Sequence, residues 1–405
     1  MNHHVAVIGA GFGDEGKGQM VDYFAATGEY ETVVRFNGGS QAGHTVVTPD
    51  GKTHIFSQIG AGAFTGLRTH ISRHMMVNPI FFMREFLDLT DKLGVAPKVS
   101  LDPEVEMILP IDVSLNRQSE LTRDAMAQAG NRGGRHGSCG HGYNNALRRS
   151  KYPNLRVTLD QLEVGGEKFL RKVLAESRKY YPGFTVQEFE ESSDAFVAAA
   201  LDMVERIGVR LDHDVVRKPC IFEGAQGLLL DRDSGFFPHV TPSSTGLHNV
   251  MSLVSDGGQG MSVYSPLVKP VYVTRSYLTR HGAGPMYFEW ARCSSERTFV
   301  ANHPDIPADE TNVHNDWQGH LRYGPLSIAQ LEHAVRKDYH NADKSRHIML
   351  EEPVLALTWA NCAVPTVEGP GAFDALQDGK HFVGGPIKLE YKSDGRTRET
   401  IARIR

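Results

Sequence analysis

An acidic residue inside a glycine-rich loop is the feature of this 405-residue sequence that most directly suggests chemistry. Asp14 lies among the glycines of residues 9–18, one residue before Glu15 and three before Lys17. The backbone N–H groups of such a loop, and the start of the helix after it, bind phosphate. The spacing from Gly11 to Lys17 matches a P-loop, but a glycine follows the lysine, so the hydroxyl that would hold magnesium is missing. Because phosphate repels a carboxylate, we expect Asp14 to bind magnesium or to take a proton from substrate.

Two strands and a helix must position this loop. Residues 5–8 are apolar and predict a buried parallel strand, and residues 19–26 predict the helix that follows the loop. Residues 31–36 predict a second strand, which ends in a second glycine loop before His44. Parallel sheets bind ligands at the carboxyl edge of their strands. We therefore expect His44, as a neutral imidazole, to donate to charge developing on a phosphate.

The rest of the hydrophobic pattern alternates between strands and helices. It predicts an α/β fold with a mainly parallel central sheet, helices on both faces, and hairpin and helical insertions near 46–128 and 160–212 of a single domain, 1–405. The expected elements are a hairpin at 46–56 that turns at 50–51, a helix at 79–93, strand pieces at 98–101 and 105–109, a helix to about 129, two or more peripheral helices within 160–212, a strand and loop at 218–231, an alternating strand through 269–285, and a strand and loop at 386–400.

Composition excludes several classes of protein. The net charge of −5 gives no broad basic surface for nucleic acid. No run of about 18 apolar residues suggests a membrane span, and the chain leads straight into its first strand, without a signal peptide. The cysteines are too few for a disulfide framework and too far apart for a zinc knuckle. We expect a cytoplasmic protein, in the host cytoplasm if a phage encodes it.

Two motifs carry a resemblance to a known family. Residues 13–18 read Gly-Asp-Glu-Gly-Lys-Gly, and residues 34–45 read Val-Arg-Phe-Asn-Gly-Gly-Ser-Gln-Ala-Gly-His-Thr. Together they resemble the adenylosuccinate synthetase family, and the resemblance recurs in order along most of the chain. It implies a C–N bond-forming ligase. A nucleoside triphosphate phosphorylates the 6-oxygen of a purine nucleotide, and aspartate then displaces the phosphate.

The resemblance also implies roles for the residues around the triphosphate. Asp14, His44 and Lys17 would be catalytic, and Asp14 with the carbonyl group of Gly43 would hold the cofactor Mg²⁺. The residues that would contact the triphosphate are Gly13, Glu15, Gly16, Lys17, Gly18, Gly43, His44, Thr45, Asn361, Ser393 and Gly395.

Residues 130–149 combine glycines with several arginines, which favours a phosphate-binding nest over a flexible linker. The family has Thr-Thr-Gly-Arg-Gly here, on the 5′-phosphate of its substrate, where this chain has Ser-Cys-Gly-His-Gly at 138–142. The family also sends one arginine into the neighbouring subunit's site, and both Arg148 and Arg149 match it. The resemblance therefore implies a homodimer with shared sites. The monophosphate-binding candidates are Asp14, Gln41, Ser138, Cys139, Arg148, Arg149, Gln226 and Thr241.

Two stretches depart from the common family pattern. The arginine-rich loop that recognises aspartate is reduced to Arg322, which leaves Thr311, Asn312 and Arg322 as candidates, or a different acceptor substrate. Asn361 stands where the family has an aspartate that reads guanine. An amide has one donor and one acceptor, which suits adenine, so we expect ATP or dATP as phosphoryl donor.

These departures resemble the phage and archaeal branch that joins aspartate to dGMP to make 2-aminoadenine nucleotides. Part of that branch replaces the loop acid with serine, whereas this chain keeps Asp14. A carboxylate can accept from N1–H and the 2-amino group of guanine, but also from N1–H of hypoxanthine. We favour dGMP, and IMP with GTP or ATP is the alternative. Rival interpretations are a catalytically inactive nucleotide sensor and a P-loop NTPase switch.

Overall fold

The computed structural model describes residues 3–129, 136–180, 186–258, 266–286, 306, 317–319, 321–342, 348–362, 366–368 and 387–404, with only the backbone described for 186–191. Its centre is an 11-stranded sheet in the order β17-β16-β15-β11-β1-β10-β2-β5-β7-β9, with β14 beside β11. Neighbouring strands run parallel except β16 and β17. The predicted fold class, a mainly parallel α/β sheet, is confirmed.

The strands of this sheet are β1 (His3–Gly9), β2 (Thr32–Arg35), β5 (Arg68–Ile71), β7 (Val99–Leu101), β9 (Gly208–Val209), β10 (Cys220–Gly227), β11 (Leu267–Arg275), β14 (Met349–Leu350), β15 (Val354–Thr358), β16 (Lys388–Ser393) and β17 (Ile401–Arg403). Three short pairs lie outside it: β3 (His44–Val47) with β4 (Thr53–Phe56), β6 (Met76–Val77) with β8 (Glu106–Met107), and β12 (Tyr277–Arg280) with β13 (Arg322–Pro325).

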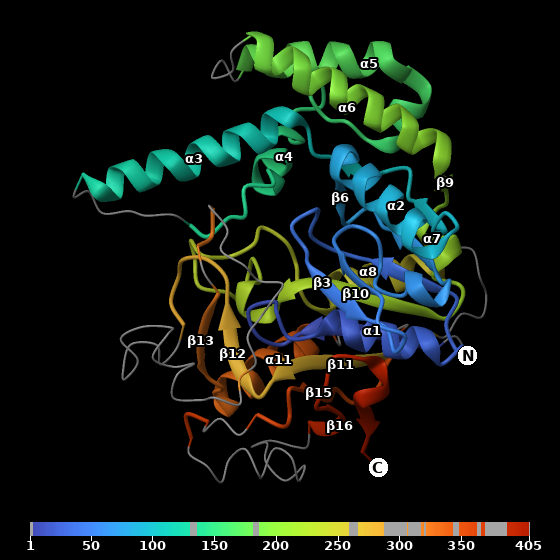
Figure 1. The fold of residues 1–405 in the computed structure, drawn as a ribbon, viewed down its shortest axis with the longest axis vertical. Helices are drawn as coiled ribbons and strands as arrows, with labels where there is room; N and C mark the ends of the chain where they lie inside the picture. Colours follow the sequence, from blue (N-terminus) through green and yellow to red (C-terminus); the bar gives the residue numbers. More distant parts are fainter. Residues whose placement is uncertain are drawn as a thin grey trace.

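The described helices are α1 (Lys17–Ala26), α2 (Pro79–Leu93), α3 (Pro110–Gln128), α4 (Tyr143–Arg149), α5 (Leu159–Tyr180), α6 (Val186–Arg206), α7 (Asp212–Val215), α8 (Leu247–Gly257) and α11 (Ile328–Ala342). Short 3₁₀ turns occupy Ala63–Thr65, Leu228–Leu230 and Arg398–Thr400. Figure 1 shows α5 and α6 side by side at one end of the molecule, with β15 and β16 at the other.

Side chains on the two faces of the sheet enter two separate hydrophobic cores. Along β1, Val5 and Val7 join the core that contains α1, α2, α5 and α6. Ala6 and Ile8 point the other way, into the core of α8 and α11. Because both faces are covered, a central strand is apolar at every position. This explains the continuous apolar run at the start of the sequence.

Local signals predicted several elements well. Residues 79–93 form α2, which Asn78 caps through hydrogen bonds from the N–H groups of Ile80 and Phe81. The hairpin at 46–56 is β3 and β4, and the two long peripheral helices are α5 and α6. Among the described residues, no helix combines the length and apolar character that crossing a membrane requires.

Two boundaries differ from the prediction. The helix expected at 19–26 begins at Lys17, because Gly16 adopts a left-handed φ of 92° and turns the chain directly into the helix. The single alternating strand expected through 269–285 is two strands. β11 ends at Arg275, and β12 leaves the main sheet to pair antiparallel with β13. Nor does β11 alternate, since its second half is buried on both faces.

Candidate active site

Loops from distant parts of the sequence enclose a cavity of about 790 Å³ at the carboxyl edge of the sheet. The loops after β1, β2 and β10 line it, together with the glycine-rich segment before α4. The cavity brings together these predicted site residues: Gly13, Asp14, Gln41, Gly43, His44, Ser138, Cys139, Arg148, Gln226 and Thr241. A second hollow of about 610 Å³, lined by Lys388, Glu390, Arg403 and Ile404, contains none of them.

The phosphate loop is shaped by one of its own side chains. The carboxylate of Glu15 accepts hydrogen bonds from the N–H groups of Gly11 and Gly13, at 3.0 and 2.6 Å, and is almost completely buried. Lys17 Nζ donates to Glu15 Oε2 at 2.9 Å and to the carbonyl of Gly13 at 2.6 Å. The first N–H groups of a helix lack an intrahelical acceptor. The start of α1 therefore remains the part of the loop best suited to a phosphate.

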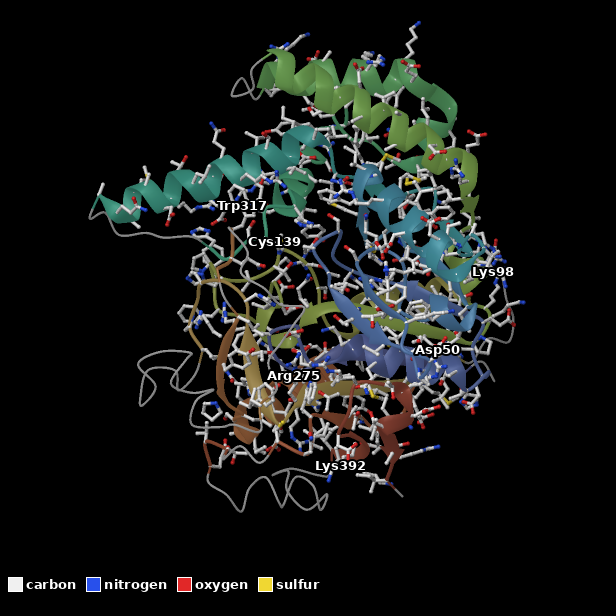
Figure 2. All side chains as sticks on the ribbon, viewed as in Figure 1. Asp50, Lys98, Cys139, Arg275, Trp317 and Lys392 are labelled. Atoms are coloured by element: carbon white, nitrogen blue, oxygen red, sulfur yellow. The ribbon has the colours of Figure 1, made fainter. Side chains whose placement is uncertain are left out.

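Asp14 is held by a partner that the sequence did not indicate. Its Oδ2 accepts a hydrogen bond from Arg275, the last residue of β11, at 3.0 Å. Arg275 also donates to the hydroxyl of Tyr277 at 3.1 Å and lies over its ring; Figure 2 labels this arginine. The carboxylate of Asp14 is about one-fifth exposed, and the residue lines the cavity. The only sequence clue to Arg275 was its place at the end of a parallel strand.

His44 belongs to a buried network of charges. Its Nδ1 lies 2.5 Å from Oε1 of Glu223, which also pairs with Arg35 at 3.1 Å. The other carboxylate oxygen of Glu223 accepts the N–H of Ala61 at 2.9 Å. Glu223 and Arg35 are fully buried. This arrangement fixes the orientation of the imidazole at the cavity wall.

The network also determines where the imidazole carries its proton. Burial lowers the pKa of His44 to about 4, against the hydrogen bond to Glu223, so the ring is neutral at neutral pH. Burial alone would raise the pKa of Glu223, but Arg35 and His44 outweigh it and hold that pKa below its usual range. The neutral ring therefore has its proton on Nδ1, toward the carboxylate. The donation to phosphate expected from the sequence requires a second proton, on Nε2.

The segment before α4 presents several polar side chains to the cavity. Ser138 Oγ donates to Oδ1 of Asn116 on α3 at 2.8 Å and accepts the N–H of Gly140 at 3.1 Å. Burial raises the pKa of Cys139 to about 11, so this residue is a thiol and a weak donor. His141, which stands at the arginine of the family motif, also lines the cavity, with Nδ1 3.2 Å from Ser40 Oγ. The sequence reasoning overlooked His141.

The structure separates the two arginines at the end of α4. Arg148 is exposed and lines the cavity. Arg149 is fully buried; it pairs with Asp112 at 3.0 Å and donates to the carbonyls of Met107 and Leu155. Of the two residues that matched the family arginine, Arg149 therefore holds α3 and α4 together, and Arg148 faces the ligand space.

Two of the amide side chains that line the cavity have an oxygen without a hydrogen-bond donor among the described residues. The side-chain oxygens of Gln41 and Gln226 are buried and accept no hydrogen bond from the described residues. Gln226 also has a left-handed φ of 58°, which costs a residue with a Cβ about 1–2 kcal/mol. Thr241 lines the same cavity. Strain of this kind is typical of ligand-binding positions.

Arg322, the predicted aspartate ligand, is the first residue of β13 and pairs with Arg280 of β12. Its guanidinium donates to the carbonyls of Gly282 and Gly284, at 2.8 to 3.0 Å. Arg280 donates to three further carbonyls nearby and lies 4.4 Å from the ring centre of Phe12. Both arginines therefore brace residues 282–285 at the cavity wall. Two other candidates for aspartate, Thr311 and Asn312, lie outside the described residues.

Two of the predicted contacts of the triphosphate base, Ser393 and Gly395, meet α1 through Gln19. Thr358, at the end of β15, donates to the carbonyl of Glu15 at 2.8 Å. Gln19 on α1 donates to Ser393 Oγ and to the carbonyl of Gly395, both at 3.0 Å. Asn361 is exposed one turn beyond β15. The remaining predicted contacts lie in the phosphate loop, in the first turn of α1, and at or just before β3: Gly13, Gly16, Gly18, Gly43 and Thr45.

Comparison with known proteins identifies the family. The sequence model of the adenylosuccinate synthetase family matches residues 6–335. The chain belongs to the adenylosuccinate synthetase family. It is 31% identical over 306 residues to the adenylosuccinate synthetase of Azotobacter vinelandii, covering 70% of this chain and 65% of that one. With the enzyme of Teredinibacter turnerae it shares 31% over 352 residues, 83% of this chain and 75% of that one.

With the enzyme of Marinomonas sp. the identity is 30% over 301 residues, and the match spans 70% of this chain and 64% of the relative's length. The matched segment is thus slightly less than two thirds of the length of the Marinomonas and Azotobacter enzymes. Solved structures share the fold. A fully ligated adenylosuccinate synthetase from Plasmodium falciparum superposes with a TM-score of 0.73 at 18% identity, covering 99% of this chain and all of that one.

A second solved structure with this fold comes from a phage. It is the succinoaminodeoxyadenylate synthetase of cyanophage S-2L, bound to dGMP and to dATP as an energy donor. The TM-score is 0.63 at 16% identity, and the match covers all of this chain and 95% of that one. At these identities, both superpositions show a common fold.

Proposed function

We propose that this protein is a ligase that joins L-aspartate to the 6-position of a purine nucleoside monophosphate, driven by a nucleoside triphosphate. The observation that carries the proposal is the position of Asp14. Asp14 belongs to the phosphate loop and also lines the cavity, together with Ser138, Gln226 and Thr241. One carboxylate can therefore reach a purine ring whose phosphate lies at the far wall. Membership of the family gives the same reaction class.

The residues of the site suit a two-step reaction. Asp14 accepts the proton of purine N1, and the 6-oxygen forms a bond to the γ-phosphorus as the bond to the nucleoside diphosphate breaks. Lys17 and the amides at the start of α1 stabilise the transferring group. The amine of aspartate then attacks C6, and phosphate leaves with the original 6-oxygen. The negative charge of bound phosphates would raise the pKa of His44. The protonated ring, held in place by Glu223, would then donate from Nε2 to the phosphoryl oxygens.

The donor set of the cavity fits Mg²⁺, the metal that the family implies. Asp14 and Gly43 both line the cavity. Mg²⁺ prefers carboxylate and carbonyl oxygens as ligands, together with phosphates and waters. No group of three or more His, Cys, Asp or Glu side chains among the described residues could hold a metal by itself. Bound there, Mg²⁺ would neutralise phosphate charge.

We favour dGMP as the monophosphate and ATP or dATP as the donor. The carboxylate of Asp14 can accept from N1–H and the 2-amino group of guanine. The side-chain amide of Asn361 offers one donor and one acceptor, which matches the adenine base of the triphosphate. The phage protein with this fold binds the same pair, dGMP and dATP. The alternative is IMP with GTP or ATP, because hypoxanthine also offers N1–H to Asp14.

We further propose a cytoplasmic homodimer with shared sites. Arg148 is the candidate for the shared arginine, since it is exposed at the cavity whereas Arg149 is buried in an ion pair. Aspartate would bind near Arg322, with Thr311 and Asn312 as further candidates. The phosphate of the monophosphate would lie against Ser138, Cys139 and Thr241.

A coupled phosphate-release assay in which each component is omitted in turn tests the proposal. We expect phosphate release to require purine monophosphate, triphosphate, Mg²⁺ and aspartate together, and Asp14→Asn to abolish it without unfolding the protein. Release with triphosphate alone would indicate an NTPase switch, and nucleotide binding without any release would indicate a sensor. Aspartate-dependent release with IMP but not with dGMP would reverse the choice of monophosphate.

A further inference from the structure

We propose that Trp317 is a positioning residue that fixes the loop of residues 137–140, and thereby sets the affinity for the monophosphate without contacting it. This inference rests on the proposed function, because it assigns the loop to the 5′-phosphate. Ser138 and Cys139 are the side chains that this loop presents to the cavity. Figure 2 labels Trp317 and Cys139 close to each other beside α3.

Trp317 closes over one end of the loop. Gly140 has a left-handed φ of 76°, and a Cβ added there would lie 3.0 Å from two carbon atoms of the indole. Arg117, on α3, donates from Nε to the carbonyl of Gly140 at 3.2 Å. The guanidinium of the same arginine lies 5.6 Å from the centre of the indole ring, within cation–π range. Indole, guanidinium and peptide therefore form one packed unit.

The other end of the loop is held by the residue after the tryptophan. Gln318 donates from Nε2 to the carbonyl of Gly137 at 2.8 Å. On its opposite side Gly137 lies against the backbone of residues 282–283, where an added Cβ would come 3.0 Å from the N of Ala283. Arg322 in turn holds that backbone through the carbonyl of Gly282. The loop is thus held between two segments that follow it by more than a hundred residues.

This clamping matters because the loop contains two flexible glycines. Gly137 and Gly140 both adopt left-handed conformations, and glycine loses more conformational entropy on ordering than any other residue. Within the loop, Ser138 Oγ is fixed by Asn116 and by the N–H of Gly140. Without the indole, Gly140 loses its packing partner, and the hydroxyl of Ser138, which accepts the N–H of Gly140, moves with it. Displacements of about 1 Å in a positioning element can cost about 100-fold in rate.

The position of Trp317 makes the inference specific to this chain's own sequence. It lies in the stretch where the common arginine-rich pattern of the family is lost. From this stretch, Trp317 packs against Gly140, and the side-chain amide of Gln318 donates to the carbonyl of Gly137. The segment proposed to recognise aspartate is consequently in direct contact with the segment proposed to bind the nucleotide phosphate.

Isothermal titration calorimetry of the full-length protein tests the inference with three variants: Trp317→Ala, Trp317→Phe and Arg117→Ala. We expect Trp317→Ala to raise the Kd for dGMP, or for IMP if that is the substrate, about tenfold. Trp317→Phe keeps an aromatic surface and should stay within about threefold of the wild type. The Kd for ATP should change less than twofold in all variants, because the start of α1 does not contact this loop. Arg117→Ala should weaken monophosphate binding in the same direction.

Steady-state kinetics supply a second readout. Trp317→Ala should raise KM for the monophosphate about tenfold while KM for ATP stays constant, and Trp317→Phe should restore it. The double variant Trp317→Ala/Arg117→Ala should lose less than the sum of the two single effects in free energy, since both act on Gly140. A general folding defect would instead weaken both nucleotides together.

Three results would overturn the inference. One is a monophosphate Kd unchanged in Trp317→Ala and in Arg117→Ala, with thermal unfolding as in the wild type. Another is an equal loss of ATP affinity. The third is a Trp317→Phe variant as weak as Trp317→Ala. If Trp317→Ala does not fold, Arg117→Ala carries the test. Wild-type protein that binds neither dGMP nor IMP would refute the proposed function itself, which is a different outcome.

Discussion

Replacing Glu223 by glutamine should separate the orientation of His44 from the rest of the site. Glu223 Oε1 lies 2.5 Å from His44 Nδ1 and 3.1 Å from a nitrogen of Arg35. A hydrogen bond to a charged group contributes about 1.5–3 kcal/mol. If the transition state loses that amount, kcat/KM falls by roughly 10- to 200-fold, since each 1.36 kcal/mol is tenfold. The amide cannot stabilise an imidazolium, so the loss should appear in kcat.

The same substitution should also reduce stability. Arg35 is fully buried. Among the described residues, Glu223 is the only carboxylate that forms an ion pair with it. The guanidinium of Arg35 also donates to the carbonyl of Ser57 and lies 3.5 Å from Nδ1 of His44. Removing one partner of a buried pair costs about 3–5 kcal/mol. We therefore expect a clear drop in the unfolding midpoint in urea, along with the loss of turnover.

A matched control distinguishes the two effects. Glu85 is also buried, and its carboxylate accepts the N–H groups of Ser57, Gln58 and Ile59. Glu85→Gln should lower the free energy of unfolding yet leave kcat within about threefold, because Glu85 does not contact His44. Kinetics at a temperature where both variants are folded provide the comparison. If Glu223→Gln turns over as fast as Glu85→Gln, the role given to this network is incorrect.

Further predictions concern stability, the donor base and the two arginines. Burial raises the pKa of Asp338 from 3.8 to about 7. As pH rises, the carboxyl group of Asp338 therefore ionises in the unfolded chain before it does in the folded one, and the free energy of unfolding falls between about pH 4 and 7 by roughly 4 kcal/mol at most. Asp338→Asn should flatten this pH dependence in urea titrations. An unchanged slope of unfolding free energy against pH would contradict it. Asn361→Asp should shift the donor preference from ATP toward GTP by about tenfold or more in kcat/KM; an unaltered ratio would exclude Asn361 from base recognition. Arg149→Met should lower unfolding free energy by about 3–5 kcal/mol, since it leaves a buried carboxylate unpaired. Arg148→Ala should instead raise monophosphate KM about tenfold with little change in stability, and the reverse pattern would exchange their roles.

Much of the fold near the site is encoded in local sequence. An apolar run, a glycine loop and an amphipathic stretch predicted β1, the phosphate loop and α1, because each depends on neighbours within a few residues. The periodicity of residues 79–93 predicted α2 with both its ends, and the structure shows Asn78 and Gly94 as its caps. The start of α1 was misplaced by two residues. Its position depends on the left-handed Gly16, and sequence alone does not say which glycine adopts that conformation.

Partners from distant strands could not be predicted in the same way. Arg275 meets Asp14 across 261 residues, and Glu223 meets His44 across 179. These contacts depend on strand order, since β11 and β10 lie on either side of β1. Single-sequence patterns fix which segments are strands, but not which strands are neighbours. The charged residues at the strand ends were visible in the sequence, and their partners were not.

The orientation of α4 shows a second limit. Arg148 and Arg149 are consecutive, so they point about 100° apart on a helix. Which one faces inward depends on Asp112, a residue of α3. The motif therefore identified the pair, while the packing of one helix against another selected the member that lines the cavity.

Isotope transfer from the 6-oxygen of the purine tests the central claim most directly. The protein would be incubated with monophosphate labelled with ¹⁸O at position 6, together with ATP, Mg²⁺ and aspartate, and the inorganic phosphate analysed by mass spectrometry. If Asp14 activates the purine for phosphorylation, each phosphate released carries one ¹⁸O atom, and Asp14→Asn releases none. Unlabelled phosphate formed at the same rate would show that water, and not the purine, accepts the phosphoryl group.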